Sequence, residues 1–286
     1  MTLPGYEVPG KEYGVTYLAL GAGVQSTALL LMSNLGLYDC PKADYAIFAD
    51  TGAEPESVYR TVSALQKCST IPVVVVQEGD LEEEFISGAV HAEGHFSNLP
   101  LFTSEEQADG TIRKGFSRRG CTADYKLRPI HRYLKREVLG LRPRQRVKTS
   151  VRAMMGISWD ETRRVKPSTD KWCDLSYPLV DNQIRREKCL RILEEHGPDY
   201  PTPSRSACYF CPFHGEVVWK NMKENDPEMW ERACAFDEAI RDQSKTGLRG
   251  KAYLHRSCAP LRSIDLTHGG QTEFEFMGCE SGYCGV

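Results

Sequence analysis

Apolar residues form short runs over the first 80 residues, and these runs alternate with stretches of helical spacing. Three runs, at 15–20, 44–49 and 71–76, are typical of buried strands, and the third is rich in β-branched residues. Between them, residues 26–32 and 55–66 carry apolar positions near helical spacing. The order strand, helix, strand, helix, strand predicts right-handed crossovers and a parallel sheet.

The same sheet is predicted to continue later in the chain. Residues 149–157 are expected to form another strand and residues 184–196 another helix, whereas residues 91–120 lack periodicity and are interpreted as an active-site loop region. Beyond about residue 200 the chain is rich in Cys, aromatic residues and Pro. We therefore expect an α/β, Rossmann-like domain over 1–200, with helices on both faces of its sheet, and a cysteine-rich extension over 201–286 packed on it.

The composition is that of a folded chain outside the membrane. The 286 residues are 41% hydrophobic and 26% charged, which excludes wholesale disorder. No apolar run approaches the roughly 20 residues of a membrane helix. The first residues, MTLPGYEVPGKEYG, lack the pattern of a signal peptide. We expect a cytoplasmic protein without a membrane partner.

Positive charge is concentrated in one segment, although the formal net charge is −3. Residues 113–152 contain 14 Lys and Arg against two acids, Asp124 and Glu137, an excess of 12 positive charges in 40 residues. Such a block is typical of a solvated helix face. It equally suits an anionic partner, such as a nucleotide, a sulfate or a nucleic-acid backbone.

Small residues follow the first strand directly, at the position that faces the ligand crevice of a parallel sheet. Gly21, Ala22 and Gly23 allow backbone N–H groups to approach phosphate oxygens, and Ser26 and Thr27 add hydroxyls at the helix start. An ordinary strand–helix turn with a Ser or Thr cap is the alternative.

A second loop ends the next strand at the neighbouring position. Asp50 is expected beside the same crevice, within reach of a ribose, an amine or a metal ion. Two adjacent loops of this kind predict a site for nucleotide phosphates. Its predicted residues are Gly21, Ala22, Gly23, Gln25, Ser26, Thr27, Asp50, Thr51 and Gly52.

The two loops resemble motifs of the N-type ATP pyrophosphatase (PP-loop) superfamily, in its phosphoadenosine phosphosulfate (PAPS) reductase-like branch. GAGVQST is similar to the pyrophosphate loop, written SGGxDS, and FADTGAEPESVYR is similar to the second motif of the PAPS reductases. RRGCTADYKLRPIHRYL, MMGISWDETRR and YPLVDNQIRREKCLRILEEHG match that branch in order, so the resemblance spans residues 15–215. It implies the adenine nucleotide alpha hydrolase type of Rossmann-like fold, with the phosphates over Gly21–Thr27.

The phosphate loop departs from the superfamily motif at three positions. Gly21 replaces its first Ser, Ala22 occupies its second position, and Gln25 replaces its Asp. Because an amide does not bind Mg²⁺ as a carboxylate does, Gln25 brings the loop closer to the reductases. In an ATP-dependent enzyme, Mg²⁺ would then bind through Asp50 and the phosphates.

The eleven cysteines do not indicate a disulfide framework, because their number is odd and the chain lacks a secretory signal. Five of them sit singly among apolar or helical residues and are expected to be small buried hydrophobes. These are Cys40, Cys68, Cys173, Cys189 and Cys234.

Cys208 and Cys211 have the spacing of a chelating pair, and 86 residues separate Cys121 from Cys208. The resemblance to adenylyl-sulfate reductases implies a [4Fe–4S] cluster on these three, with the fourth iron open to sulfide or closed by Cys258. Unliganded thiols, a dithiol pair and a structural zinc site that adds His214 or Cys258 are the alternatives. The neighbouring cations, which suit thiolates or an anionic substrate, are Arg118, Arg119, Lys126 and Arg128.

Three further groups of residues carry predictions. Arg163 and Arg164 follow the fourth strand, where they suit a phosphate or sulfate clamp or belong to a plain surface loop. PAPS reductases carry a catalytic Cys in a short C-terminal tail, so the resemblance implies Cys284, with Cys279, as a candidate nucleophile. An incidental tail thiol is the alternative. Helical spacing predicts that Trp219, Trp230 and Phe236 belong to the core.

Together these features predict adenine-nucleotide-dependent sulfur chemistry with an iron–sulfur cluster. The resemblance extends to the ATP-pyrophosphatase-like proteins of DNA phosphorothioation systems. It implies ATP, a cysteine desulfurase or other sulfur donor, and nucleic acid or modification-complex proteins as partners. One alternative is a reductase that releases sulfite from PAPS or adenylyl sulfate. Another is a non-catalytic zinc module that binds nucleic acid through the basic block.

Overall fold

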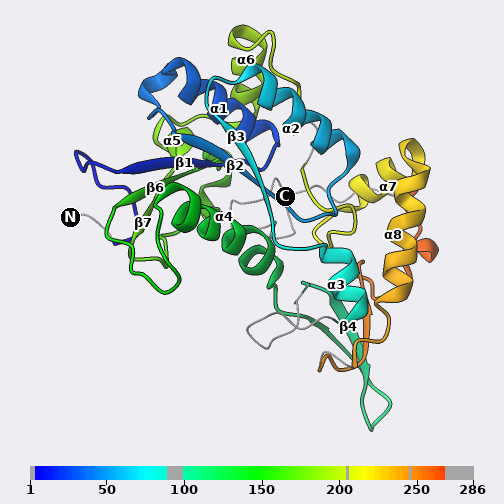
Figure 1. Ribbon diagram of the computed structural model, residues 1–286. Helices are drawn as coiled ribbons and strands as arrows, with labels where there is room; N and C mark the ends of the chain where they lie inside the picture. Colours follow the sequence, from blue (N-terminus) through cyan, green and yellow to red (C-terminus); the bar gives the residue numbers. More distant parts are fainter. Residues whose placement is uncertain (1–3, 89–98, 204–205, 245–246, 268–286) are drawn as a thin grey trace.

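Five parallel strands form the central sheet (Figure 1). The computed structural model describes residues 4–88, 99–203, 206–244 and 247–267. The strand order is β3-β2-β1-β6-β7, which confirms the predicted parallel sheet and its extension by residues 149–157. The strands are β1 (Val15–Ala19), β2 (Tyr45–Asp50), β3 (Val73–Gln77), β6 (Val151–Met155) and β7 (Cys173–Ser176).

The direction of the strand order reverses beside β1. This strand pairs with β2 on one side and, from Val15↔Val151 to Ala19↔Met155, with β6 on the other. In open parallel sheets, this reversal point at the carboxyl edge is where ligands bind.

Helices cover both faces of the sheet, as predicted. On one face Leu18 and Leu20 belong to a core with residues of α1 (Val24–Leu35), α2 (Glu56–Cys68) and α6 (Arg186–His196). On the other face Tyr17 and Ala19 pack in a core with Ile130 and Leu134. These last two residues belong to α4 (Arg128–Tyr133) and to the second of the π-helical turns that flank it, Ala123–Leu127 and Leu134–Val138.

The prediction of a loop region over residues 91–120 is wrong where the structure describes it. β4 (Phe102–Glu106) and β5 (Ile112–Phe116) form an antiparallel hairpin, and β8 (Lys251–Tyr253) pairs with β4 to complete a three-stranded sheet. Every residue of β5 is exposed, so the strand lacks the apolar alternation that identifies half-buried strands. The usable signal was Asp109–Gly110, because Gly110 adopts a φ of 79° in the turn.

The segment after residue 205 shares a core with the middle of the chain. Trp219, Trp230 and Phe236 are buried, as predicted, and they lie in one cluster with Leu81 and Phe85. The remaining helices are α3 (Leu81–Ser87), α5 (Pro178–Asp181), α7 (Glu216–Asn225) and α8 (Pro227–Ala239), with 3-10 turns at Leu37–Asp39, Trp159–Arg164 and Leu261–Ser263. Within the described ranges, no helix has both the length and the apolar character needed to cross a membrane.

Four of the five cysteines predicted to be buried are buried, namely Cys40, Cys173, Cys189 and Cys234, whereas Cys68 is half-buried. Burial raises the pKa of Cys40, Cys173 and Cys189 to about 12 and that of Cys234 to about 11. These thiols stay protonated at neutral pH.

Candidate functional site

The loop from β1 to α1 presents an uncapped helix end to the carboxyl edge of the sheet. Gly23 is the cap residue of α1, where no side chain caps the helix and no acid lies in the first turn. Ala22 is fully buried with a φ of 56°, so the loop is tightly turned. The first backbone N–H groups of α1 therefore lack a side-chain cap and could bind an anion.

Two hydroxyls lie at the start of α1. Ser26 Oγ donates to the carbonyl oxygen of Gly23 over 3.2 Å. Thr27 is completely buried, and its Oγ1 has no hydrogen-bond partner among the described residues. Ser26 thus stabilises the loop itself, whereas Thr27 retains an unsatisfied polar atom beside it.

Gly156, directly after β6, supports this loop. A Cβ atom placed on Gly156 would lie 2.9 Å from both the backbone nitrogen and the Cα atom of Ser26. Real Cβ atoms do not approach backbone so closely, and only a residue without a side chain fits at this position. The end of β6 therefore packs directly on the phosphate loop.

The side chain of Gln25 is held between two other elements. Its Oε1 accepts a hydrogen bond from Arg186 Nη1 at 2.9 Å, and its Nε2 donates to Glu161 Oε2 at 3.2 Å. Glu161 Oε1 also forms an ion pair with Arg164 at 2.6 Å. Of the two predicted clamp residues, Arg164 is thus buried against a carboxylate, and Arg163 is exposed.

Asp50 ends β2 at the same edge of the sheet. Its Oδ1 accepts hydrogen bonds from the Gly52 N–H and the Tyr59 hydroxyl, both at 2.9 Å. Burial, followed by the contact with Asp50, raises the pKa of Tyr59, so the phenol stays a donor. No described residue forms a hydrogen bond with Oδ2, which leaves that oxygen for a ligand or a metal ion.

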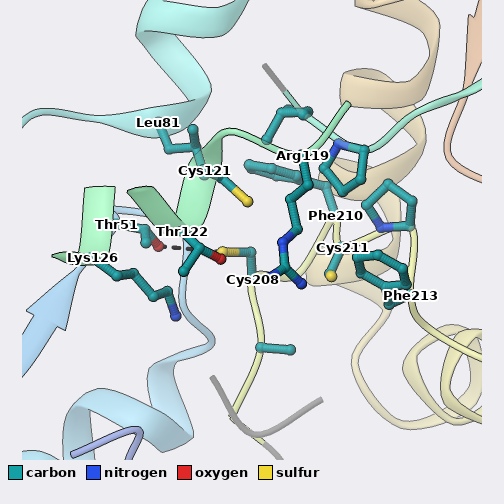
Figure 2. Close-up of a pocket in the computed structure, with 14 residues that line it drawn as sticks. Thr51, Leu81, Arg119, Cys121, Thr122, Lys126, Cys208, Phe210, Cys211 and Phe213 are labelled. Carbon is teal, nitrogen blue, oxygen red and sulfur yellow. Dashed lines mark hydrogen bonds between the residues drawn. The ribbon is translucent and has the colours of Figure 1, made fainter. Parts of the chain in front are cut away.

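Cys121, Cys208 and Cys211 line one cavity of about 40 Å³, room for a few water-sized atoms. Thr51, Arg119 and Lys126 belong to the same lining. Figure 2 shows the three sulfur atoms and the guanidinium group of Arg119 gathered in one part of this cavity. Arg119 also lies over the Phe213 ring, with 5.9 Å between its Cζ and the ring centroid.

The loop after β2 connects the cavity to the carboxyl edge of the sheet. Thr51 Oγ1 lies 3.3 Å from Cys208 Sγ, and the carbonyl oxygen of Ala53 accepts the Tyr209 N–H at 2.9 Å. Cys211 and Cys208 are held in a tight turn by the hydrogen bond from the Cys211 N–H to the Cys208 carbonyl oxygen, at 2.9 Å. One short loop therefore contacts the cysteine turn and carries Asp50 at its start.

A buried ion pair lies beside Cys208. Lys126 Nζ is 3.4 Å from Glu54 Oε1, and both side chains are almost completely buried. Burial lowers the pKa of Lys126, but Glu54 and the nearby thiols raise it by more, so the ammonium stays charged. Burial raises the pKa of Cys121 and, with the Glu54 carboxylate adding to it, raises that of Cys208 well above its usual value.

The three thiols supply soft donors, although as placed they are not a finished metal site. Across residues 4–88, 99–203, 206–244 and 247–267, no group of three or more His, Cys, Asp or Glu side chains is arranged to hold a metal ion. A ligand must therefore draw the three sulfur atoms together and replace their protons.

The other predicted contributors lie outside the cavity lining. Cys258 Sγ is 3.5 Å from the carbonyl oxygen of Thr103, and His214 Nε2 is 3.0 Å from the carbonyl oxygen of Cys208. Arg128 forms an ion pair with Asp124 at 2.9 Å, and Arg118 is exposed. Cys279 and Cys284 lie outside the described residues.

Glu54, Glu161 and Arg186 are site residues that the sequence analysis did not single out. Glu54 stands four positions after Asp50, within the segment FADTGAEPESVYR, so its place in that motif was an available signal. Arg186 and Glu161 contact Gln25 across 161 and 136 positions of sequence. Only the fold brings Gln25, Glu161 and Arg186 together.

No known protein-family model matches the chain, and no curated protein matches it either.

Proposed function

We propose that this chain is an adenine-nucleotide-dependent sulfur-transfer enzyme of the ATP pyrophosphatase type. The observation that carries the proposal is the loop after β2, which starts with Asp50 at the crevice and contacts Cys208 through Thr51 at 3.3 Å. This arrangement supports a reaction in which a nucleotide-activated group and a sulfur species meet.

The nucleotide half of the proposal rests on the edge formed by β1, β2 and β6. The N–H groups at the start of α1 would bind the phosphates of ATP, and Asp50 would hold Mg²⁺ together with those phosphates. An oxygen of the acceptor attacks the α-phosphorus, pyrophosphate leaves, and the acceptor oxygen carries AMP. Arg186 and Glu161 keep Gln25, and with it the loop, in a fixed orientation.

The sulfur half rests on the cysteine cavity. Cys121, Cys208 and Cys211 would hold a [4Fe–4S] cluster, which would supply iron chemistry for accepting sulfide. The sulfide comes from a donor, such as the persulfide of a cysteine desulfurase after reduction by a thiol. Sulfur then bonds to the acceptor atom, the bond from that atom to oxygen breaks, and AMP leaves with the oxygen. Arg119 and Lys126 balance the negative charge of thiolates and sulfide.

A reductase of PAPS or adenylyl sulfate is the second candidate. It is favoured by Gln25, whose amide is bound by Arg186 and Glu161 and does not offer Mg²⁺ a carboxylate. In this reaction the Cys284 thiolate attacks the sulfate sulfur, the nucleotide leaves, and a second thiol releases sulfite while the cysteine ends as a disulfide.

A zinc module that binds nucleic acid is the third candidate, and the size of the cavity favours it. A cavity of about 40 Å³ is closer in size to one metal ion than to a cluster of eight iron and sulfur atoms. Here Cys121, Cys208 and Cys211 would hold zinc, and the protein would catalyse no reaction.

An assay with both nucleotides separates the three candidates. Protein purified without oxygen is given ATP, Mg²⁺, sulfide and a DNA duplex, and in parallel PAPS with dithiothreitol. We expect AMP and pyrophosphate in equal amounts from ATP, and no sulfite from PAPS. Sulfite that disappears in Cys284→Ser would establish the reductase, and a colourless zinc protein inactive with both nucleotides would establish the module.

The affinity for a metal ion is expected to rise with pH between about 6 and 8.5. The pKa values of Cys121 and Cys208 are raised, so both thiols are protonated at neutral pH and each must release a proton to the solvent when it binds metal. The association constant should then rise about tenfold per pH unit for each proton released. Competition with a zinc chelator across this range measures the slope, and a flat profile would contradict the assignment of these thiols as ligands.

A further inference from the structure

The structure divides the basic segment at 113–152 into paired and unpaired cations. Four of its cations form ion pairs with carboxylates from other parts of the chain or from the same helix. These pairs are Lys126–Glu54, Arg128–Asp124, Arg132–Glu78 and Arg152–Glu7. Carboxylates of the protein balance the positive charge of these four residues, which therefore offer little charge to an external partner.

The loop at 141–148 differs from these four ion-paired cations. Arg113, Lys114 and Arg118 are exposed as well, but Arg113 stands opposite Glu105 in the hairpin. Arg142, Arg144, Arg146 and Lys148 are all exposed, and none of them forms an ion pair with a described residue. No acidic residue occurs between Glu137 and Asp160. Four cations within seven positions therefore make a strongly positive surface.

Hydrogen bonds fix the conformation of this loop. The Leu141 N–H donates to the Lys135 carbonyl oxygen at 2.8 Å, and Arg136 Nη1 donates to the Leu141 carbonyl oxygen at 2.7 Å. A turn follows, in which the Gln145 N–H donates to the Arg142 carbonyl oxygen at 3.1 Å and Gln145 Oε1 accepts the Arg142 N–H at 2.9 Å. The loop is thus held in place before any partner binds, which lowers the entropy cost of binding.

At the end of the loop, two exposed charges flank one residue that faces the protein. Val147 is half-buried, whereas its neighbours Arg146 and Lys148 are exposed. In extended backbone, residues two positions apart lie on the same side about 6.6 Å from each other. Arg146 and Lys148 therefore project away from the side of the chain that Val147 occupies, next to the turn that carries Arg142 and Arg144.

The cations of this loop lie near the amino ends of the strands, at the opposite edge of the sheet from the proposed nucleotide site. The loop leads into the start of β6, where the Gly14 N–H donates to the Ser150 carbonyl oxygen at 3.0 Å. The crevice lies at the other end of β6, and five residues of strand span about 16 Å. The cations of the loop are therefore too far away to contact a nucleotide that binds at the carboxyl edge of the sheet.

We propose that the loop at 141–148 is a docking site for the phosphate backbone of a nucleic acid. The closely spaced guanidinium and ammonium groups complement the negative charge of successive phosphates. The planar guanidinium group of Arg can also bind two oxygens of one phosphate. The large exposed hydrophobic residues of the described chain lie elsewhere. The loop therefore lacks the apolar centre of a protein–protein interface and the apolar anchor of a membrane-binding segment.

This docking site goes beyond the proposed function, and the test of the docking site does not depend on the proposed function. Binding at the amino edge of the sheet uses neither the phosphate loop nor the cysteine cavity. A polymer can extend from this loop around the molecule, whereas a mononucleotide cannot. Loss of docking with sulfur transfer intact, or the reverse, would show which of the two proposals fails.

The experiment compares two triple variants of equal charge change. Arg144→Gln, Arg146→Gln and Lys148→Gln are combined in one protein. Lys42→Gln, Lys67→Gln and Arg191→Gln, three exposed cations outside the basic segment, are combined in the control. Fluorescence anisotropy with a 20-base-pair DNA duplex and a 20-nucleotide RNA, across a series of salt concentrations, gives the dissociation constants.

We expect the loop variant to lose affinity by about tenfold or more at low salt, because about three phosphate contacts disappear. The slope of log affinity against log salt should fall in magnitude by about 2 to 3. The control should keep both the affinity and the slope of the parent protein, and both variants should keep its melting temperature.

Three results would overturn the proposal. The first is a parent protein that binds neither oligonucleotide at low salt. The second is an equal loss in the loop variant and the control, which would show that only the net charge matters. The third is tighter binding to polyglutamate or to phosphatidylserine vesicles through the same three residues, which would assign the loop to an acidic protein or a membrane.

Discussion

Replacing Cys208 with Ala is expected to reduce bound metal from about one centre per chain to a trace. Cys208 lines the cavity with Cys121 and Cys211, and its Sγ atom lies 3.3 Å from Thr51 Oγ1 in the loop after β2. Loss of one thiolate from a three-thiolate set leaves two donors, and the affinity should fall at least about 100-fold. Elemental analysis of protein purified without oxygen, with the iron absorption bands, measures the change.

The matched control is Cys258→Ala. Cys258 is also half-buried, but it contacts the carbonyl oxygen of Thr103 and does not line the cavity. Its replacement should leave the metal content unchanged, which would also exclude it as a fourth ligand. Each variant should change the free energy of unfolding of the metal-free protein by only about 1 kcal/mol. A full complement of metal in Cys208→Ala would refute the predicted ligand set.

Strands β1, β2 and β6 could be predicted because burial on both faces leaves a continuous apolar run, and β3 could be predicted from its β-branched residues. Strand β7, with the sequence CDLS, lacks such a run and was not predicted. The run at 44–49 ends at Asp50, and β2 ends at that same residue. The hairpin of β4 and β5 could not be found in this way. Glu105 pairs with Arg113 across its two strands, and exposed polar strands carry no hydrophobic pattern.

The candidate site was predictable where a motif is continuous and unpredictable where the fold joins distant residues. The spacing of Cys208 and Cys211 is visible in the sequence, and the fold brings Cys121 to the same cavity. From the sequence, Arg163 and Arg164 were equivalent candidates for the phosphate or sulfate clamp. The structure separates them, because the short turn after β6 buries Arg164 against Glu161 and exposes Arg163.

The Lys126–Glu54 pair shows why charge alone does not define a site. In the sequence, Lys126 is one of 14 cations in a basic block. In the structure it is buried beside Cys208, with its charge balanced by Glu54 at 3.4 Å. Removal of either partner would leave a buried charge uncompensated, which costs several kcal/mol. Lys126 therefore holds the loop after β2 next to the cavity, in addition to its effect on the thiols.

Replacing Gly156 with Val is expected to weaken nucleotide binding by on the order of 100-fold. A Cβ at this position would lie 2.9 Å from the backbone nitrogen and Cα of Ser26, and neither atom can move without the phosphate loop. The N–H groups at the start of α1 would then shift away from the phosphates. A displacement of about 1 Å in a binding group can cost a factor of about 100. Gly156→Ala should be intermediate, because it adds the Cβ without the two methyl groups.

Gly215→Val is the control for this experiment. Gly215 precedes α7, has an ordinary φ of −74°, and no heavy atom lies within 4 Å of a Cβ built there. Calorimetric titration with ATP and with PAPS, together with thermal melting, separates a local shift of the loop from unfolding. The control should bind both nucleotides as the parent protein does. If Gly156→Val also binds them with the parent affinity, the loop between β1 and α1 is not the phosphate site, and the nucleotide half of the proposed function fails with it.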